Sequence, residues 1–252
     1  MRRDEFLFVD PISTDDVLRT VAANRSGGWI VTVNTDILRR VHRDDDFRTL
    51  VKSADVAVAD GMPIVWAARL SGRRLPGRTA GSDLVWLLAE SAAKQGRRIF
   101  LLGGNEGVAE QAALILKRKF EGLQIAGTAC PPLGFDRDVA YMSSLRDSLV
   151  AAKPDVVYVA LGSPLQDRVI ASLRDALPES WFIGVGIALS YMVGDVRRAP
   201  VLLRRVGLEW LFRLVQEPRR LGVRYVRDDL PFALWLLGRA TTRRIAAFRG
   251  DT

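Results

Sequence analysis

The sequence predicts an α/β protein: a Rossmann-like open, mostly parallel sheet with helices on both faces, followed by a basic α-helical C-terminal appendage. Two observations predict this architecture. Short apolar runs alternate with helical stretches over the first 196 residues, and the excess positive charge of the chain lies entirely after them. Such alternation is typical of a doubly wound parallel sheet. We therefore expect an α/β domain over residues 1–196 and a basic helical appendage over residues 197–252.

The expected strands are apolar runs rich in Val and Ile, a pattern that indicates strands buried on both faces. They are WIVTVN (29–34), VAVAD (56–60), RIFLLG (98–103), QIAGTA (124–129), DVVYVAL (155–161) and WFIGVG (181–186). Helical stretches are expected at 35–53, 63–71, 82–95, 106–119, 136–152 and 164–176. Capping pairs support two helix starts, Ser13 with Asp16 and Ser82 with Asp83, because a hydroxyl at a helix N-cap accepts a hydrogen bond from a free backbone N–H.

The composition is that of an ordinary globular protein, with 48% hydrophobic and 26% charged residues among 252. A single cysteine, Cys130, excludes an internal disulfide framework and a Cys-rich metal site. The N-terminal stretch MRRDEFLFVD has no apolar core long enough for a signal peptide. We therefore expect a reduced, cytoplasmic setting.

The positive charge of the chain is unevenly distributed. Residues 197–252 contain 13 Arg and 5 acidic residues, a balance of +8, whereas the 196 residues before them carry 24 basic and 24 acidic side chains. A preference for Arg over Lys accounts for the choice of basic residue but not for its position. A basic segment of this kind is typical of proteins that bind anionic lipid, nucleic acid or a phosphorylated ligand.

Polar residues and glycines lie at or just after the carboxyl ends of four expected strands, where ligands bind in open α/β sheets. They are Thr32 and Asn34, Asp60 before Gly61, Gly103 with Gly104 and Gly107, and Gly162 with Ser163 and Gln166. Glycine lets the backbone approach a ligand closely, and the following helix N-terminus offers N–H groups to a phosphate. Each set alone has a structural explanation, as a turn or a helix cap. Together they favour nucleotide or sugar-nucleotide binding.

Asp60 closes a wholly apolar strand, so we expect a half-buried carboxylate that can act as a general base. The only histidine, His42, is expected on a polar helix surface beside Arg39, Arg40 and Arg43. Without a second histidine or a cysteine cluster, no transition-metal site is expected. The chain also has no GxSxG elbow, P-loop or kinase motif.

Nine motifs, in order along the chain, resemble the WecG/TagA/CpsF glycosyltransferases (glycosyltransferase family 26). They are T-x-N (32–34), ADGMP (59–63), R-x-x-G-x-D-L (78–84), FLLGG (100–104), PPLGF (131–135), LGSPLQD (161–167), GVG (184–186), RRAP (197–200) and GLEWLFRLVQEPRR (207–220). The resemblance implies an inverting, metal-independent enzyme without a cofactor. It would move a sugar, N-acetylmannosamine or a related hexose, from a UDP-sugar to a polyprenyl-diphosphate-linked sugar at the inner face of the membrane, in cell-surface polysaccharide or teichoic acid synthesis.

The resemblance also implies roles for residues of this chain. Asp60 is expected to be the base, and Thr32 and Asn34 to hold the sugar or order that base. The remaining expected residues contact the donor or its diphosphate: Arg78, Gly103, Gly104, Gly162, Gln166, Arg213, Arg219 and Arg220. Arginines of the C-terminal segment would stabilise the departing UDP in place of a metal. Trp210 and Phe212 are expected to anchor that segment to the body of the protein or to lipid.

The sequence departs from the family pattern at three places: Leu189–Ser190 stands where Phe-Asp is common, Asp167 where Glu is usual, and Asp195 where Lys is frequent. Two interpretations stay open: these changes would alter the choice of sugar, or they would mark a paralogue with reduced activity.

The end of the chain predicts contact with a membrane surface. The apolar run 234–237 is far shorter than the roughly 20 residues that a spanning helix needs. Arg239, Arg243, Arg244 and Arg249 follow it. An amphipathic helix lying on an anionic leaflet fits this pattern, and an oligomer contact is the main alternative.

Two other classes of function stay open. A basic nucleotide- or nucleic-acid-binding α/β protein without transferase activity would carry the same charge, although no nucleic-acid recognition motif is visible and no nucleic-acid partner is expected. A Rossmann oxidoreductase is disfavoured, because the dinucleotide-binding fingerprint is missing.

Overall fold

A computed structural model describes residues 5–205 and 207–249 of the chain. Its centre is one six-stranded sheet in the order β2-β1-β6-β5-β3-β4, in which all neighbouring strands are parallel. The strands are β1 (Gly28–Val33), β2 (Val56–Ala59), β3 (Arg98–Gly103), β4 (Gln124–Ala129), β5 (Val156–Ala160) and β6 (Trp181–Gly184). The six predicted strands and the α/β fold class are confirmed.

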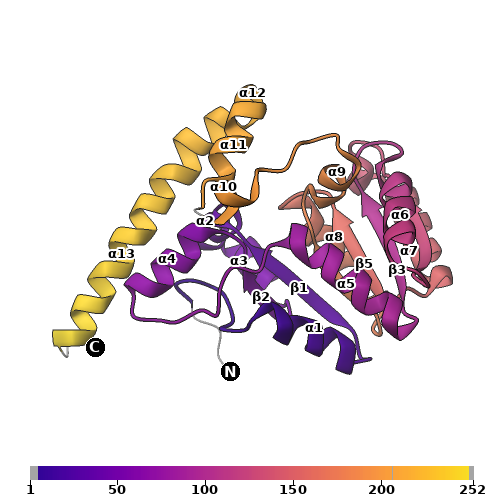
Figure 1. The fold of residues 1–252 in the computed structure, drawn as a ribbon, viewed down its shortest axis with the longest axis horizontal. Helices are drawn as coiled ribbons and strands as arrows, with labels where there is room; N and C mark the ends of the chain where they lie inside the picture. The colour runs from indigo at the N-terminus through magenta and orange to yellow at the C-terminus, as the bar shows by residue number, and fades with distance from the viewer. Residues whose placement is uncertain (1–4, 206, 250–252) are drawn as a thin grey trace.

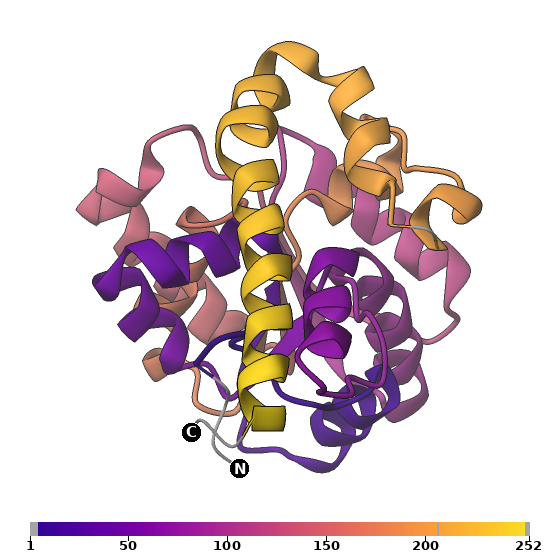
Figure 2. The same ribbon diagram turned by 90° about the vertical axis from the view of Figure 1, so that its left-hand side faces the viewer.

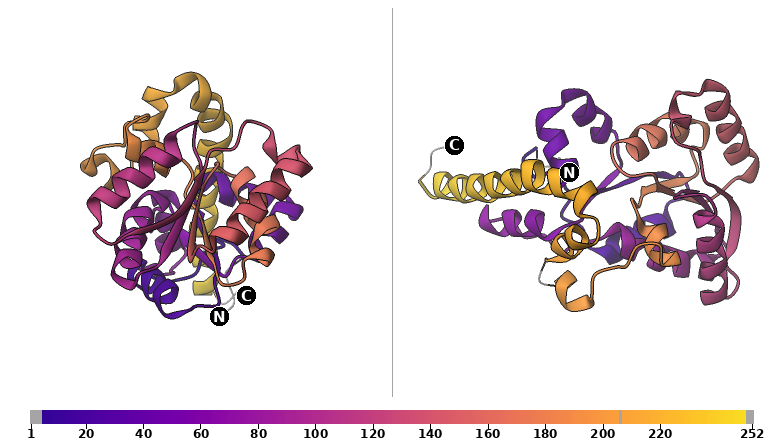
Figure 3. Two further views of the ribbon diagram at one scale, coloured as in Figure 1. Left: turned by 90° about the vertical axis from the view of Figure 1, so that its right-hand side faces the viewer. Right: turned by 90° about the horizontal axis from the view of Figure 1, so that it is seen from above.

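Helices cover both faces of this sheet (Figure 3). Those of the body are α1 (Thr14–Ala23), α2 (Thr35–Arg43), α3 (Asp45–Lys52), α4 (Met62–Leu70), α5 (Gly81–Gln95), α6 (Val108–Lys119), α7 (Val139–Ala152), α8 (Leu165–Leu173) and α9 (Ala188–Val193), with short 3-10 turns at Phe135–Arg137 and Arg174–Ala176. One apolar core joins the sheet to α2, α3, α4, α7 and α8, and a second joins it to α1, α5, α6 and α9. Because α2 and α9 leave the neighbouring strands β1 and β6 toward opposite faces, a crevice forms between these strand ends.

The structure corrects two predictions about helix boundaries and confirms a third. The predicted helix 35–53 is two helices, because Asp44 ends α2 and its carboxylate caps α3 by accepting from the Phe47 N–H at 2.9 Å. The predicted Ser82 cap is wrong: α5 begins at Gly81 without a side-chain cap. The Ser13 cap is confirmed as a reciprocal capping box with Asp16.

The C-terminal segment is helical, as predicted, and folds back onto the body. It contains α10 (Val201–Arg205), α11 (Glu209–Gln216), α12 (Pro218–Val223), a π-helical turn (Arg224–Asp229) and α13 (Leu230–Arg249). Figures 1 and 2 show α13 running along the outside of the molecule, against α4 and across the end of α2. Phe232, Leu236 and Ala240 are buried in the first core. The appendage therefore shares the core of the sheet domain.

This packing corrects the expectation for His42. The ring is half-buried, with Nε2 2.8 Å from the Phe6 carbonyl oxygen, and it packs against the rings of Phe6, Phe232 and Trp235. The expected polar surface is covered because α13 crosses it. The packing of α13 also divides the predicted apolar run 234–237 between core and surface. Leu236 is buried, whereas 63% of Leu234 and 47% of Trp235 are exposed. In the described part of the chain, no helix combines the length and apolar character needed to cross a membrane.

Candidate active site

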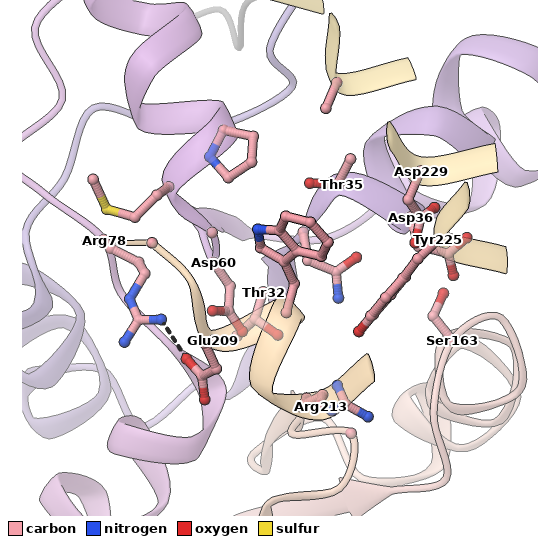
Figure 4. Close-up of a pocket in the computed structure, with 18 of the residues that line it drawn as sticks. Thr32, Thr35, Asp36, Asp60, Arg78, Ser163, Glu209, Arg213, Tyr225 and Asp229 are labelled. Atoms are coloured by element: carbon pink, nitrogen blue, oxygen red, sulfur yellow. Dashed lines mark hydrogen bonds and ion pairs between the residues drawn. The ribbon is translucent and has the colours of Figure 1, made fainter. Parts of the chain in front are cut away.

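A cavity of about 470 Å³ lies at the carboxyl ends of β2, β1, β6 and β5. Residues that follow these four strands form its floor, and residues of the C-terminal segment form its roof (Figure 4). This is where an open parallel sheet places a ligand, since the helices diverge there and leave polar strand ends uncovered. The cavity brings together most of the residues that the sequence analysis selected: Thr32, Asn34, Asp60, Arg78, Gly162, Gln166 and Arg213.

Asp60 follows β2 directly and extends its ladder, with its N–H donating to the Val33 carbonyl oxygen at 2.7 Å. Its carboxylate Oδ2 accepts from the Gly81 N–H at 3.2 Å. Burial raises the pKa of Asp60 to about 6, and the positive charge of Arg78 opposes that rise. A carboxylate that titrates near neutral pH in a cavity is suited to general-base chemistry.

Hydrogen bonds between strand ends hold the floor of the cavity. Thr32 is buried and its Oγ1 donates to the Gly184 carbonyl oxygen at 2.9 Å. The Gln166 Oε1 accepts from the Gly186 N–H at 3.1 Å. A Cβ at Gly184 would lie 2.6 Å from Gln166 Nε2, so a larger residue there would displace the Gln166 amide from its present position. Both side chains therefore fix the end of β6 beside the crevice.

Asn34 is also the N-cap residue of α2. Its side-chain oxygen caps α2 by accepting from the Ile37 N–H at 3.0 Å. The residue still lines the cavity. The amide nitrogen is thus the part of Asn34 that is available to a ligand.

Arg78 is paired with the roof. Its Nη1 donates to Glu209 at 2.7 Å, and Asp83 lies 3.7 Å from Nη2. Although burial by itself lowers the pKa of Arg78, the hydrogen bond to Glu209 and the charge of Asp60 raise it above the ordinary value. Arg198 joins the same cluster, 2.7 Å from Asp83 and 3.8 Å from Glu209. These ion pairs tie α11 and the segment before it to the body.

Aromatic and basic side chains complete the roof. Trp210 meets the Tyr225 ring edge-on, with 6.2 Å between centroids. Arg213 lines the cavity, and its Nε is buried without a hydrogen-bond partner in the described residues. Burial raises the pKa of Tyr191 to about 12, so this phenol on the cavity wall stays neutral and can donate a hydrogen bond.

A second ion-pair cluster fixes the start of α13. Asp229 lies 3.4 Å from Arg39 and 3.3 Å from Arg224, and Arg39 also binds Asp36. Burial raises the pKa of Asp229, and the nearby charge of Asp36 adds to that effect. Because Asp36 and Arg39 belong to α2, this cluster joins the roof to the helix that follows β1.

Several selected residues lie outside the cavity lining. Gly103 ends β3 and Gly104 follows it, on the far side of β5 from the cavity. A Cβ at Gly103 would meet the Ala160 carbonyl oxygen at 2.5 Å. Close packing alone thus requires glycine at position 103, and donor binding there stays a prediction. Arg219 is exposed on α12, and the side chain of Arg220 lies outside the described residues.

Two of the departures from the family pattern are buried. Leu189 packs in the second core. Asp167 is fully buried, and burial raises its pKa to about 6. Neither lines the cavity. Within this cavity, these positions act through packing rather than through direct contact with a ligand.

The sequence analysis missed Glu209, Tyr191, Tyr225, Asp36 and Asp229, all of which line the cavity. The position of Glu209 inside an otherwise basic motif is a signal that could have been used, because a buried acid there requires a cationic partner. No local pattern marks the other four. In the part of the chain that the structure describes, no group of three or more His, Cys, Asp or Glu side chains could hold a metal ion.

Comparisons with known proteins agree with the resemblance found in the sequence. The model of the family "Glycosyl transferase WecG/TagA/CpsF family" matches residues 6–246. Two similar proteins are both named N-acetylglucosaminyldiphosphoundecaprenol N-acetyl-beta-D-mannosaminyltransferase. The one from Bacillus spizizenii strain W23 is 33% identical over 201 residues, which cover 80% of this chain and 76% of the relative. The one from Bacillus subtilis strain 168 is 32% identical over 194 residues, or 77% and 73% of the two chains.

Proposed function

This chain belongs to the WecG/TagA/CpsF family of glycosyl transferases, and on that premise we propose its substrates and mechanism. The donor is a UDP-sugar of the N-acetylmannosamine type. The acceptor is N-acetylglucosamine linked through a diphosphate to a polyprenol, as the names of the two relatives suggest. The reaction contributes to the synthesis of a cell-surface polymer.

The observation that carries this proposal is Asp60, a carboxylate with a pKa of about 6 on the floor of the cavity. Asp60 removes the proton from the acceptor hydroxyl while that oxygen attacks the anomeric carbon. The bond from that carbon to the UDP oxygen breaks, and the electron pair leaves with UDP. A single displacement of this kind inverts the anomeric centre. A positioned general base contributes about 10²–10⁴-fold to the rate of such a step.

The leaving diphosphate requires positive charge. Arg213 offers a guanidinium group whose Nε has no hydrogen-bond partner in the described residues. Arg78 is already paired with Glu209, so a donor diphosphate would compete with that carboxylate for the same guanidinium. Preorganised guanidinium groups stabilise developing phosphate charge without a metal. We propose the same diphosphate-binding role for Arg219 and Arg220, because both belong to the family motif at 207–220.

We place the protein at the inner face of the membrane, bound to its surface. On α13, Leu234 and Trp235 are exposed beside Arg239 and Arg243. Apolar and basic side chains together favour an anionic leaflet. An oligomer contact through this helix is the competing explanation.

The test is turnover of the purified full chain. A panel of UDP-sugars is incubated with N-acetylglucosaminyl diphosphoundecaprenol, with and without EDTA. We expect transfer from UDP-N-acetylmannosamine or a close relative, with inverted product and no loss on chelation. Binding of UDP without transfer from any donor would favour a nucleotide-binding protein instead. Loss of transfer in EDTA that Mg²⁺ restores would overturn the metal-free mechanism.

A further inference from the structure

The cavity has two chemically different halves. The half around Asp60 and Arg78 is polar and charged. The other half is lined by apolar side chains: Met62, Pro63 and Trp66 from α4, and Leu230, Ala233, Leu234 and Leu237 from α13. The two halves are continuous, so one ligand can occupy both.

The apolar half is a groove built by the packing of α13. Its four residues on α13 are spaced at helical intervals and form one stripe along the helix. Phe232, Leu236 and Ala240 lie on the adjacent stripe and are buried in the core, which fixes the rotation of the helix and turns the first stripe toward the cavity. The Asp229–Arg39 ion pair holds the beginning of the same helix.

The connection from α10 to α11 supports the other wall. Gly207 has a φ of +77°, and a Cβ there would lie 2.7 Å from Met62 Cβ and 3.0 Å from the Trp66 ring. Its backbone therefore packs directly against the side chains that line the groove. Leu234, on the opposite wall, is 63% exposed, so the groove is open to the outside rather than filled as a core.

We infer that this groove between α4 and α13 holds the first isoprene units of the acceptor, so that the polyprenyl tail leaves the catalytic cavity along α13. The inference rests on the proposed function and adds a binding site for the tail. An apolar groove continuous with a charged site fits a ligand with an ionic head and a hydrocarbon tail. The apolar side chains that line the groove would bury hydrocarbon favourably, whereas they would replace part of the water around a sugar without forming hydrogen bonds to its hydroxyl groups.

The central experiment fills the groove. Ala233→Phe places a ring between the two walls, and Ala247→Phe is its matched control, since Ala247 is an exposed alanine of the same helix outside the cavity lining. Each variant is assayed in detergent with two acceptors. One is N-acetylglucosaminyl diphosphoundecaprenol, and the other is the same sugar diphosphate with a methyl group in place of the undecaprenyl chain. Thermal melting of both variants establishes that they are folded.

For Ala233→Phe we expect the KM of the undecaprenyl acceptor to rise by about tenfold or more, the range of specificity that apolar pockets provide. The KM of the methyl acceptor and of the UDP-sugar should stay unchanged. The Ala247→Phe control should match the wild type with both acceptors. Leu234→Glu, at an exposed position, should have the same selective effect by placing a charge beside the tail.

An equal rise in KM for both acceptors, or no change for either, would overturn the inference. Binding is also measured without turnover, by titrating wild type and Ala233→Phe with undecaprenyl diphosphate. Equal affinities would overturn the inference even if the proposed reaction were wrong. Conversely, weaker binding by Ala233→Phe supports the groove as a tail site, whatever sugar is transferred.

Discussion

The floor and the roof of the cavity are held by different forces. On the floor, Thr32 and Gln166 are fixed by hydrogen bonds to the backbone at the end of β6. The roof is held by ion pairs, chiefly Arg78–Glu209 and Arg39–Asp229, and by the packing of α13. Backbone hydrogen bonds within a buried sheet are insensitive to salt, whereas ion pairs near the surface are screened by it. The floor therefore provides a fixed frame for chemistry, and the roof is the part that substrate charge can rearrange.

The largest effect should come from removing the roof. Deleting residues 196–252 removes Arg213 and Glu209 and uncovers the apolar contacts of α13 on the body. We expect transfer to become undetectable and the protein to melt at a lower temperature. Turnover and circular dichroism measure the two effects. Transfer within a factor of about ten of the full chain would mean that the floor alone suffices.

Asp60→Asn tests the floor. We expect turnover to fall by about 10²–10⁴-fold, while UDP binding measured by calorimetry is nearly unchanged. The free energy of unfolding of Asp60→Asn, by contrast, should exceed that of the wild type at neutral pH. Since the pKa of Asp60 rises to about 6 on folding, the native state binds the proton more tightly, and the wild type loses stability as pH rises from about 4 to 6.

The neutral Asn avoids that loss. Asp60→Asn should therefore gain up to about 3 kcal/mol in free energy of unfolding at pH 7, with the gain disappearing near pH 4. Urea unfolding at both pH values measures this difference. A loss of stability at pH 7, or turnover within about threefold of the wild type, would contradict the role of Asp60 as a buried base.

The effect of Arg78 and Glu209 on the pKa of Asp60 can be tested through the pH dependence of kcat/KM. As the proposed general base, Asp60 would act in its deprotonated form, so kcat/KM should fall as pH falls through its pKa. The charge of Arg78 lowers that pKa and the charge of Glu209 raises it. Arg78→Gln should thus shift the acidic limb of the profile to higher pH, and Glu209→Gln should shift it to lower pH, each by less than about one unit.

Glu90→Gln makes the same charge change as Glu209→Gln on the exposed surface of α5, where Glu90 pairs with Lys94, and serves as the control. Its acidic limb should coincide with that of the wild type. Shifts of the same sign for Arg78→Gln and Glu209→Gln would show that neither charge acts on Asp60 as the structure indicates.

The smallest effect concerns the outer surface of the roof. Replacing the exposed Arg239 and Arg243 of α13 by Gln removes two positive charges and leaves the buried residues of the helix in place. We expect weaker co-sedimentation with anionic liposomes, since each basic residue near such a surface contributes about 1 kcal/mol. The difference from the wild type should shrink at high salt. Equal sedimentation of both proteins would favour an oligomer contact for α13.

The six strands and much of the floor could be predicted from the pattern of amino acids. A strand buried on both faces must be apolar throughout, so its six runs are visible without knowledge of their neighbours. For the same reason a polar residue that ends such a run, as Asp60 does, is conspicuous. The carboxyl ends of parallel strands lie at one edge, which is why Thr32, Asp60 and Gln166 could be grouped before their contacts were known.

The geometry of the roof follows from tertiary packing, although Arg213 was selected from the sequence. Helical periodicity shows that α13 has apolar positions, but it does not say which distant surface they meet. The burial of His42, the pairing of Glu209 with Arg78 and the groove beside Trp66 all depend on where α13 and α11 return to the body. Ion pairs and cavity walls join residues far apart in the chain. Their geometry follows from the packing of whole elements, which no local pattern contains.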